Sequence, residues 1–162
     1  EECTDIVAIL DAKKDWKNYV LYQEDNTLLS SYNTTPIEID WISDKFKSYI
    51  EKEFSFSISS ISISALKYNV GDNFCRHYDR NPNFEDNKDF LYNVNVVIND
   101  NFEGGEFWLD DKPFLESSPG MGYSYSSSQW HEVKTITKGI RYSMLCYIRE
   151  RDLVLKNSNT LI

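Results

Sequence analysis

Residues 139–149, with the sequence GIRYSMLCYIR, carry the strongest strand pattern in the chain. Between Arg141 and Arg149 successive side chains alternate between two faces. One face carries Tyr142, Met144, Cys146 and Ile148, and the other carries Ser143, Leu145 and Tyr147. Arg141 is the exception, because a cation on such an apolar strand is costly unless an anion lies beside it. We therefore expect a buried strand with one charged group at its start.

Working outward from this strand, the second half of the chain consists of short apolar runs separated by turn residues. Gly104-Gly105 marks a turn that only glycine tolerates, and Gly120 and Gly122 bracket another. The predicted strands are Ile58 to Tyr68, with a slip at Ser59-Ser60, then Tyr92 to Ile98, Glu106 to Leu109 and Tyr123 to Ser127. Many short strands with turn signals between them predict a β-sandwich or barrel.

The first third of the chain has a different pattern. Thr4 and Asp5 are candidate caps for a helix with Ile6, Ile9 and Leu10 on one face, and Asp40 for a helix through Phe46, Tyr49 and Ile50. Trp16 to Leu21 is an early strand candidate, and Pro36 to Asp40 is a break. The predicted fold is mainly β: a jelly roll, or double-stranded β-helix, with the N-terminal helices packed outside it.

The length and composition of the chain exclude several classes of protein. The chain has 162 residues, which suits a single domain over 1–162, and 41% apolar residues, which excludes a disordered tail. The net charge is −9, from 17 Lys and Arg against 26 Asp and Glu. No basic run offsets this charge, so nucleic acid is an unlikely partner. No apolar run approaches the roughly 20 residues that cross a bilayer.

Three cysteines, Cys3, Cys75 and Cys146, fit neither a disulfide framework nor a zinc motif. Their odd number and the lack of a signal peptide predict free thiols and a cytoplasmic location. The oligomeric state stays open.

The whole chain contains two histidines, His77 and His131. Asp79 follows His77 by two residues, so on a strand both side chains point to the same face. His131 must come from another strand. Two histidines and one carboxylate on one face of a metal leave the opposite positions open, an arrangement typical of non-haem Fe(II) oxygenases.

Arg141 follows His131 by 10 residues. If its anion is the carboxylate of a ligand, the guanidinium can bind that carboxylate through two parallel hydrogen bonds. Ser143 lies two residues further on the same face and can donate to the same carboxylate.

These residues occur within a series of motifs: YNVGDNF at 68–74 ahead of HYD at 77–79, NDNFEGGE at 99–106, HEV at 131–133 and TKGIRYS at 137–143. In this order and spacing the chain resembles the Fe(II)- and 2-oxoglutarate-dependent dioxygenases, in the branch of the prolyl 4-hydroxylases. The resemblance covers about residues 68–149, whereas residues 1–67 fit the helical flank of the family only loosely.

The resemblance implies a role for each matching residue. His77, Asp79 and His131 would bind iron, and Arg141 would pair with the distal carboxylate of 2-oxoglutarate with help from Ser143 and Tyr68. Asn95, on a face shared with Asn93 and Val97, is a further candidate for the cosubstrate; either asparagine could equally satisfy backbone groups. No catalytic residue is expected beyond the metal centre. The implied cofactors are Fe(II), 2-oxoglutarate and O2. Whether ascorbate is also required stays open.

Two positions depart from the family pattern. Collagen-type prolyl hydroxylases have Lys at the position of Arg141, and Val97 stands where a cosubstrate-binding Tyr is frequent. The expected activity is hydroxylation of a C–H bond in a prolyl or other residue of a peptide or protein, with release of succinate and CO2. The alternatives are the same chemistry on a free amino acid or other small molecule, and a jelly-roll binding module without catalysis. Arg76 and Arg80 flank the metal pair and are interpreted as a solvated rim.

Overall fold

The computed structural model describes residues 1–83, 85–114 and 118–155. It contains the helices α1 (Glu2–Ala12) and α2 (Asp40–Glu53) and a short 3-10 helix at Glu150–Asp152. The strands are β1 (Lys17–Tyr22), β2 (Leu28–Ile37), β3 (Phe56–Ile58), β4 (Ile63–Tyr68), β5 (Phe74–His77), β6 (Phe90–Val97), β7 (Glu103–Gly104), β8 (Phe107–Leu109), β9 (Lys112–Pro113), β10 (Gly122–Ser126), β11 (His131–Val133), β12 (Ile136–Lys138), β13 (Arg141–Arg149) and β14 (Leu153–Leu155).

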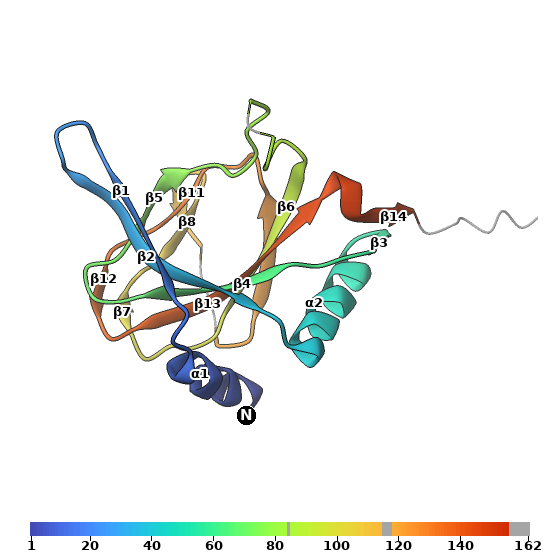
Figure 1. Ribbon diagram of the computed structural model, residues 1–162, viewed down its shortest axis with the longest axis horizontal. Coiled ribbons are helices and arrows are strands. Elements are labelled where there is room, and N and C mark those ends of the chain that lie inside the picture. The colour runs from blue at the N-terminus through green and yellow to red at the C-terminus, as the bar shows by residue number, and fades with distance from the viewer. Residues whose placement is uncertain (84, 115–117, 156–162) are drawn as a thin grey trace, which may run out of the picture.

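Two antiparallel sheets form a jelly roll (Figure 1). The larger has the strand order β1-β2-β4-β13-β6-β10 and the smaller β5-β11-β8-β9. Their facing sides meet in a largely aromatic cluster, which we call the inner cluster: Tyr32, Leu66, Tyr68, Phe107, Tyr125, Val133, Ile136 and Leu145. The predicted mainly β fold with two helices is confirmed.

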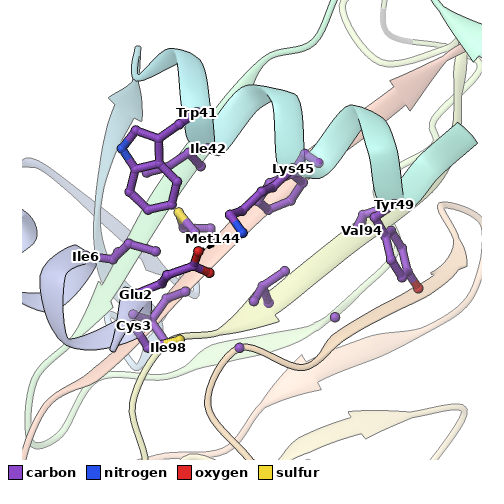
Figure 2. A pocket seen from close by; sticks show the side chains of 14 residues that line it. Glu2, Cys3, Ile6, Trp41, Ile42, Lys45, Tyr49, Val94, Ile98 and Met144 are labelled. Carbon is purple, nitrogen blue, oxygen red and sulfur yellow. Dashed lines mark ion pairs between the residues drawn. The ribbon is translucent and has the colours of Figure 1, made fainter.

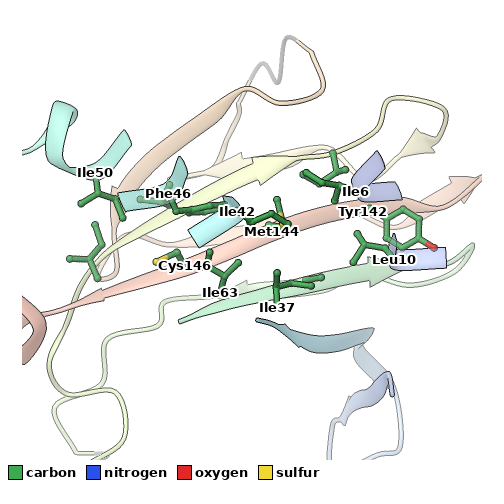
Figure 3. Packing of buried hydrophobic residues seen from close by; sticks show 14 of the residues in the cluster. Ile6, Leu10, Ile37, Ile42, Phe46, Ile50, Ile63, Tyr142, Met144 and Cys146 are labelled. Carbon is green, nitrogen blue, oxygen red and sulfur yellow. The ribbon is translucent and has the colours of Figure 1, made fainter. Parts of the chain in front are cut away.

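Both helices cover the opposite side of the larger sheet (Figures 1 and 3). Helix α1 contributes Ile6 and Leu10, and α2 contributes Ile42, Phe46 and Ile50. They pack on outward-facing residues of β4, β6 and β13 to form what we call the outer cluster. The larger sheet is therefore buried on both sides by two different kinds of core.

Strand β13 has the bounds and the two faces that the sequence predicts. Tyr142, Met144, Cys146 and Ile148 belong to the outer cluster. Leu145 lies on the other side, in the inner cluster. Because β13 pairs with both β4 and β6, it occupies the centre of the larger sheet.

Several predicted boundaries are wrong. The strand predicted from Ile58 to Tyr68 is two strands, because Ser59 and Ser60 turn away and bond through their hydroxyls to Asp152. Strand β2 was not predicted: Pro36 belongs to it instead of starting the break. The pairing of β2 with β1 ends at Thr34. Pro36 lies beyond it, where β1 offers no acceptor for a backbone N–H of β2.

The predicted helix caps are also wrong. Helix α1 is capped by Glu1, so Thr4 and Asp5 lie inside its first turns. Ile39 caps α2, which places Asp40 in the first turn, where a carboxylate favours the positive end of the helix dipole. Strands β6 and β10 are each shifted toward the N-terminus relative to the prediction.

The three cysteines are free thiols, as their odd number predicts. Across the described ranges, neither helix has the length and apolar character needed to cross a membrane.

A groove of about 150 Å³ lies between α1, α2 and the larger sheet (Figure 2). Its floor is made of Val94, Val96, Ile98 and Met144. An ion pair of 2.8 Å between Lys45 Nζ and Glu2 Oε1 spans its rim. Since its floor is apolar, this groove extends the outer cluster, and the two charged side chains on its rim are paired with each other.

Candidate metal centre

The two histidines lie opposite each other on neighbouring strands of the smaller sheet. His77 ends β5 and His131 begins β11, and the antiparallel register pairs them directly. Their ring centroids are 4.2 Å apart. Cross-strand neighbours in an antiparallel sheet point to the same face, so both imidazoles reach the space between the sheets.

Both imidazoles are oriented by the same local contact. His77 Nδ1 donates to the carbonyl of Cys75 at 2.7 Å, and His131 Nδ1 donates to the carbonyl of Gln129 at 3.0 Å. A carbonyl oxygen only accepts, so each ring carries a proton on Nδ1 and presents Nε2 to Asp79. In this orientation a histidine binds a metal through Nε2.

Asp79 reaches the same point by a route that the sequence did not predict. Strand β5 ends at His77, so Asp79 lies in the bend beyond it and not on a shared strand face. Its backbone N–H donates to the carbonyl of Ser127 at 2.9 Å, as does the N–H of Arg80. The β10–β11 connection therefore places the carboxylate beside the histidines.

The three side chains bring one donor atom each to within 4.8 Å of one another. Asp79 Oδ2 lies 3.2 Å from His131 Nε2, and Asp79 Oδ1 lies 3.6 Å from His77 Nε2. Burial alone would raise the pKa of the Asp79 carboxyl, but hydrogen bonds and charge interactions with His131 and His77 outweigh it and hold that pKa below its ordinary value. The carboxylate is therefore ionised at neutral pH.

This donor set fits a divalent metal ion. His77 Nε2 is buried and has no hydrogen-bond partner within the described chain. Nε2 of each histidine faces the ionised Asp79 carboxylate, so the three groups converge on one point that a divalent cation can occupy. Two imidazoles with one carboxylate are the ligands of non-haem Fe(II) sites that keep positions open.

A small cavity adjoins the three donor atoms. It measures about 20 Å³, which is enough for one ion or one water molecule. Tyr68 and Asn95 line it together with the three ligands. A cosubstrate the size of 2-oxoglutarate must therefore displace side chains in order to bind here.

Arg141 lies beyond Tyr68 in the interior. It is fully buried at the start of β13, opposite Tyr68 on β4. Its Nη1 donates to Ser143 Oγ at 3.1 Å, and its Cζ lies 5.6 Å from the Tyr68 ring centroid. A Cβ at Gly105 would lie 3.2 Å from Arg141 Cδ, so the predicted glycine turn also leaves room for this side chain.

The structure separates the roles of the two asparagines on β6. Asn95 is 4% exposed, lines the cavity, and its Oδ1 has no hydrogen-bond partner within the described chain. Asn93 is fully buried, and its Nδ2 donates to Asp79 Oδ2. Only Asn95 is therefore available to a ligand.

The two arginines that flank the ligand pair differ from each other. Arg76 binds Asp111 through Nε at 2.9 Å and stacks 4.3 Å from the Trp130 ring centroid. Arg80 donates through Nε to the carbonyl of Lys88 at 3.2 Å. Trp130 itself is 39% exposed, so this stack lies at the surface.

The sequence analysis missed Ser127 and Tyr125. Ser127 is fully buried, and its hydroxyl donates to Asn93 Oδ1 at 2.7 Å. Tyr125 is buried on β10, with its ring 4.8 Å from that of His131. Burial, and then the nearby Asp79 charge, raise the pKa of the Tyr125 hydroxyl well above its ordinary value. Neither residue has a signal in the sequence, since Ser and Tyr are abundant around them.

No protein-family model matches the sequence, and neither does any curated protein. Solved structures do match its fold. A prolyl hydroxylase from Trichoplax adhaerens, in complex with a peptide fragment of the hypoxia-inducible-factor oxygen degradation domain, has a TM-score of 0.70 at 20% identity, over 94% of this chain and 80% of that one.

Two further structures support the same fold. A 2OG-Fe(II) oxygenase family oxidoreductase from Burkholderia pseudomallei has a TM-score of 0.64 at 13% identity, over 94% of this chain and 81% of its own. A prolyl-4-hydroxylase from Pseudomonas putida has a TM-score of 0.60 at 17% identity, over 91% and 82%. The likeness extends over most of the chain, beyond the motifs at 68–149, and the chain has the jelly-roll fold of the 2OG-Fe(II) oxygenases and prolyl hydroxylases.

Proposed function

We propose that the chain is a Fe(II)- and 2-oxoglutarate-dependent dioxygenase that hydroxylates a C–H bond of an amino-acid residue in a peptide or protein. The observation that carries the proposal is the convergence of His77, Asp79 and His131 inside the jelly roll, with the buried Arg141 on the neighbouring sheet. When bound, Fe(II) with 2-oxoglutarate and O2 supplies the oxidising power, and succinate and CO2 are released as one oxygen atom enters the C–H bond.

His77, Asp79 and His131 would hold the metal. The carbonyls of Cys75 and Gln129 accept from Nδ1 of the two histidines and so keep Nε2 of each ring aimed inward. The Asp79 carboxylate, whose pKa is held below its ordinary value, supplies the negative charge. Three protein ligands leave the remaining positions of the metal to the cosubstrate and O2.

Arg141, Ser143, Tyr68 and Asn95 would hold 2-oxoglutarate. The guanidinium is fully buried, and Ser143 Oγ accepts a hydrogen bond from it, which leaves the serine proton free to donate to a carboxylate. Tyr68 connects the two ends of the site, since it lines the cavity at the metal ligands and faces Arg141. Asn95 lies in the wall of the same cavity and would bind 2-oxoglutarate through its amide N–H, since the carboxylates and keto group of the cosubstrate only accept.

The aromatic side chains around the site would exclude water. Phe74 stacks on His77 with ring centroids 3.8 Å apart, and Phe107 lies 5.9 Å from His131. A dry site protects a reactive intermediate from side reactions. The inner cluster therefore serves the reaction as well as the fold.

A peptide or protein substrate is supported by the prolyl hydroxylase from Trichoplax adhaerens, whose structure holds a peptide. The test is succinate release from 2-oxoglutarate with Fe(II) under O2, with and without a library of Pro-containing peptides. Succinate release stimulated by a peptide supports the proposal. Stimulation by free amino acids alone would move the substrate to the small-molecule class, and absence of all turnover despite metal binding would indicate a binding module.

A further inference from the structure

Asp79, Ser127 and Asn93 form a closed ring of hydrogen bonds. The backbone N–H of Asp79 donates to the carbonyl of Ser127 at 2.9 Å. The hydroxyl of Ser127 donates to Asn93 Oδ1 at 2.7 Å, and Asn93 Nδ2 donates back to the Asp79 carboxylate at Oδ2. Ser127 thus contacts both the backbone of Asp79 and the residue that binds its side chain.

The ring fixes the direction of the Asn93 amide. Because Ser127 donates to the amide oxygen, the NH2 end of Asn93 faces Asp79. In a flipped amide the Asn93 oxygen would face the Asp79 carboxylate, and both groups are acceptors. Asn93 and Ser127 are both fully buried, so water does not compete for these bonds. Ser127 is itself fixed through its backbone N–H, which donates to the carbonyl of Leu91 at 3.0 Å.

The two oxygens of the Asp79 carboxylate are therefore unequal. Oδ2 accepts a hydrogen bond from Asn93 and lies 3.2 Å from His131 Nε2, whereas Oδ1 lies 3.6 Å from the buried Nε2 of His77 and accepts nothing from Asn93. A carboxylate with two free oxygens can bind a metal through both and occupy an additional coordination position. A hydrogen bond to one oxygen opposes this, because it restrains rotation and uses a lone pair.

We propose that Asn93 and Ser127 are positioning residues that restrict Asp79 to a single metal bond through Oδ1 and so keep a coordination position open for the cosubstrate. The proposal rests on the proposed metal function of the triad. Neither residue touches the metal or the substrate in this scheme; each acts through Asp79. It also explains why β6 carries an asparagine at 93 in an otherwise dry interior.

The experiment measures Co(II) binding to the full chain under anaerobic conditions, together with the melting temperature of the metal-free protein. Asn93→Leu keeps the branched shape of the side chain but neither donates nor accepts. Ser127→Ala removes one hydroxyl and keeps the backbone carbonyl. We expect the Co(II) dissociation constant to rise about 10- to 100-fold for Asn93→Leu and less for Ser127→Ala, as is usual for partners of metal ligands.

A visible absorption spectrum of bound Co(II) gives a second readout, which a purely structural role would not move. Its intensity depends on coordination number, so a two-oxygen Asp79 in the variants changes the spectrum. One matched control should keep the wild-type Co(II) constant: Ser128→Ala, which removes an exposed hydroxyl in the same turn as Ser127.

The outcomes separate this inference from the proposed function. Wild-type protein that binds no Co(II) contradicts the metal centre itself. Wild-type constants and spectra in folded Asn93→Leu and Ser127→Ala overturn the positioning role alone. If Asn93→Leu does not fold, Ser127→Ala decides, and a fall in its metal-free melting temperature without any change in Co(II) binding also overturns the proposal.

Discussion

The two faces of the larger sheet have opposite chemistry, although the same strands build both. On β6, Val94 and Val96 turn toward the helices, whereas Asn93 and Asn95 turn toward the smaller sheet. The outer cluster is mainly aliphatic, and the inner cluster is largely aromatic and adjoins buried polar groups such as Arg141 and His131.

This difference indicates that the outer face mainly stabilises the fold and the inner face carries the candidate site. Aliphatic burial stabilises the fold at roughly 25 cal/mol per Å² and makes no demand for partners. Burying a polar group costs free energy unless the group is hydrogen-bonded. A concentration of buried polar groups on one face of the sheet therefore indicates a functional site. The size of a cavity misleads here, since the groove of about 150 Å³ lies on the helix side and the cavity at the metal ligands measures about 20 Å³ (Figure 2).

The largest expected effect is on the inner face. His77→Ala, Asp79→Ala and His131→Ala should each abolish succinate release, because each removes one of three protein bonds to the metal. The melting temperature of the metal-free protein should change far less than activity, since each substitution leaves both hydrophobic clusters intact. Full activity in any one variant would remove that residue from the site.

Arg141→Ala should raise the apparent 2-oxoglutarate constant by about one and a half to three and a half decades. This corresponds to about 2–5 kcal/mol for truncating one partner of a buried charge pair, at 1.4 kcal/mol per decade. Arg141→Lys should fall between, because Lys keeps the charge but loses the two-pronged geometry. Loss of melting temperature with an unchanged cosubstrate constant would instead show that Arg141 serves a protein carboxylate.

The outer face should respond in the opposite way. Leu10 is fully buried in the outer cluster, and Leu10→Ala should reduce the free energy of unfolding by about 2–5 kcal/mol. Thermal or urea unfolding measures this loss, and Co(II) affinity of the folded protein should stay at the wild-type value. Leu28→Ala is the matched control, since Leu28 is 45% exposed on β2. A weakened metal site in Leu10→Ala would show that the two faces are coupled.

The last prediction concerns stability in alkaline solution, and its effect is absent at neutral pH. Burial, the main cause, raises the pKa of the Cys146 thiol from 9.0 to about 12. The unfolded chain releases this proton first as pH rises, so the free energy of unfolding should fall between pH 9 and 12 by about 1.4 kcal/mol per pH unit from this group. Cys146→Ala should remove that part of the slope, as urea unfolding at several pH values will measure. Equal slopes in the two proteins would contradict the assignment.

The sequence by itself determined the strands that alternate strongly and the identity of the metal-binding candidates. In β13 successive side chains point to opposite faces, so the period of two fixes which residues share a face before any partner strand is known. The ligand candidates were limited by composition, because the chain has only two histidines. Arg141 was found because its charge conflicts with its strand.

The tertiary structure decided what depends on contacts between distant segments. Asp79 lies past the end of β5, and only its bond to Ser127, 48 residues later in number, brings it to the histidines. Strand β1 agrees with the strand predicted from Trp16 to Leu21, but every one of its residues is exposed, so only its bonds to β2 show that it lies at the edge of the sheet.

The same reason separates Asn93 from Asn95. The two residues are of the same type and lie on the same face of the same strand, so the strand period of two cannot distinguish them. Asn93 lies opposite Tyr125 on β10 and within reach of Ser127, so its amide is used within the protein; Asn95 lies two residues further and faces the cavity. Local pattern fixes the face of a side chain, whereas its partner is set by which segments the fold brings together.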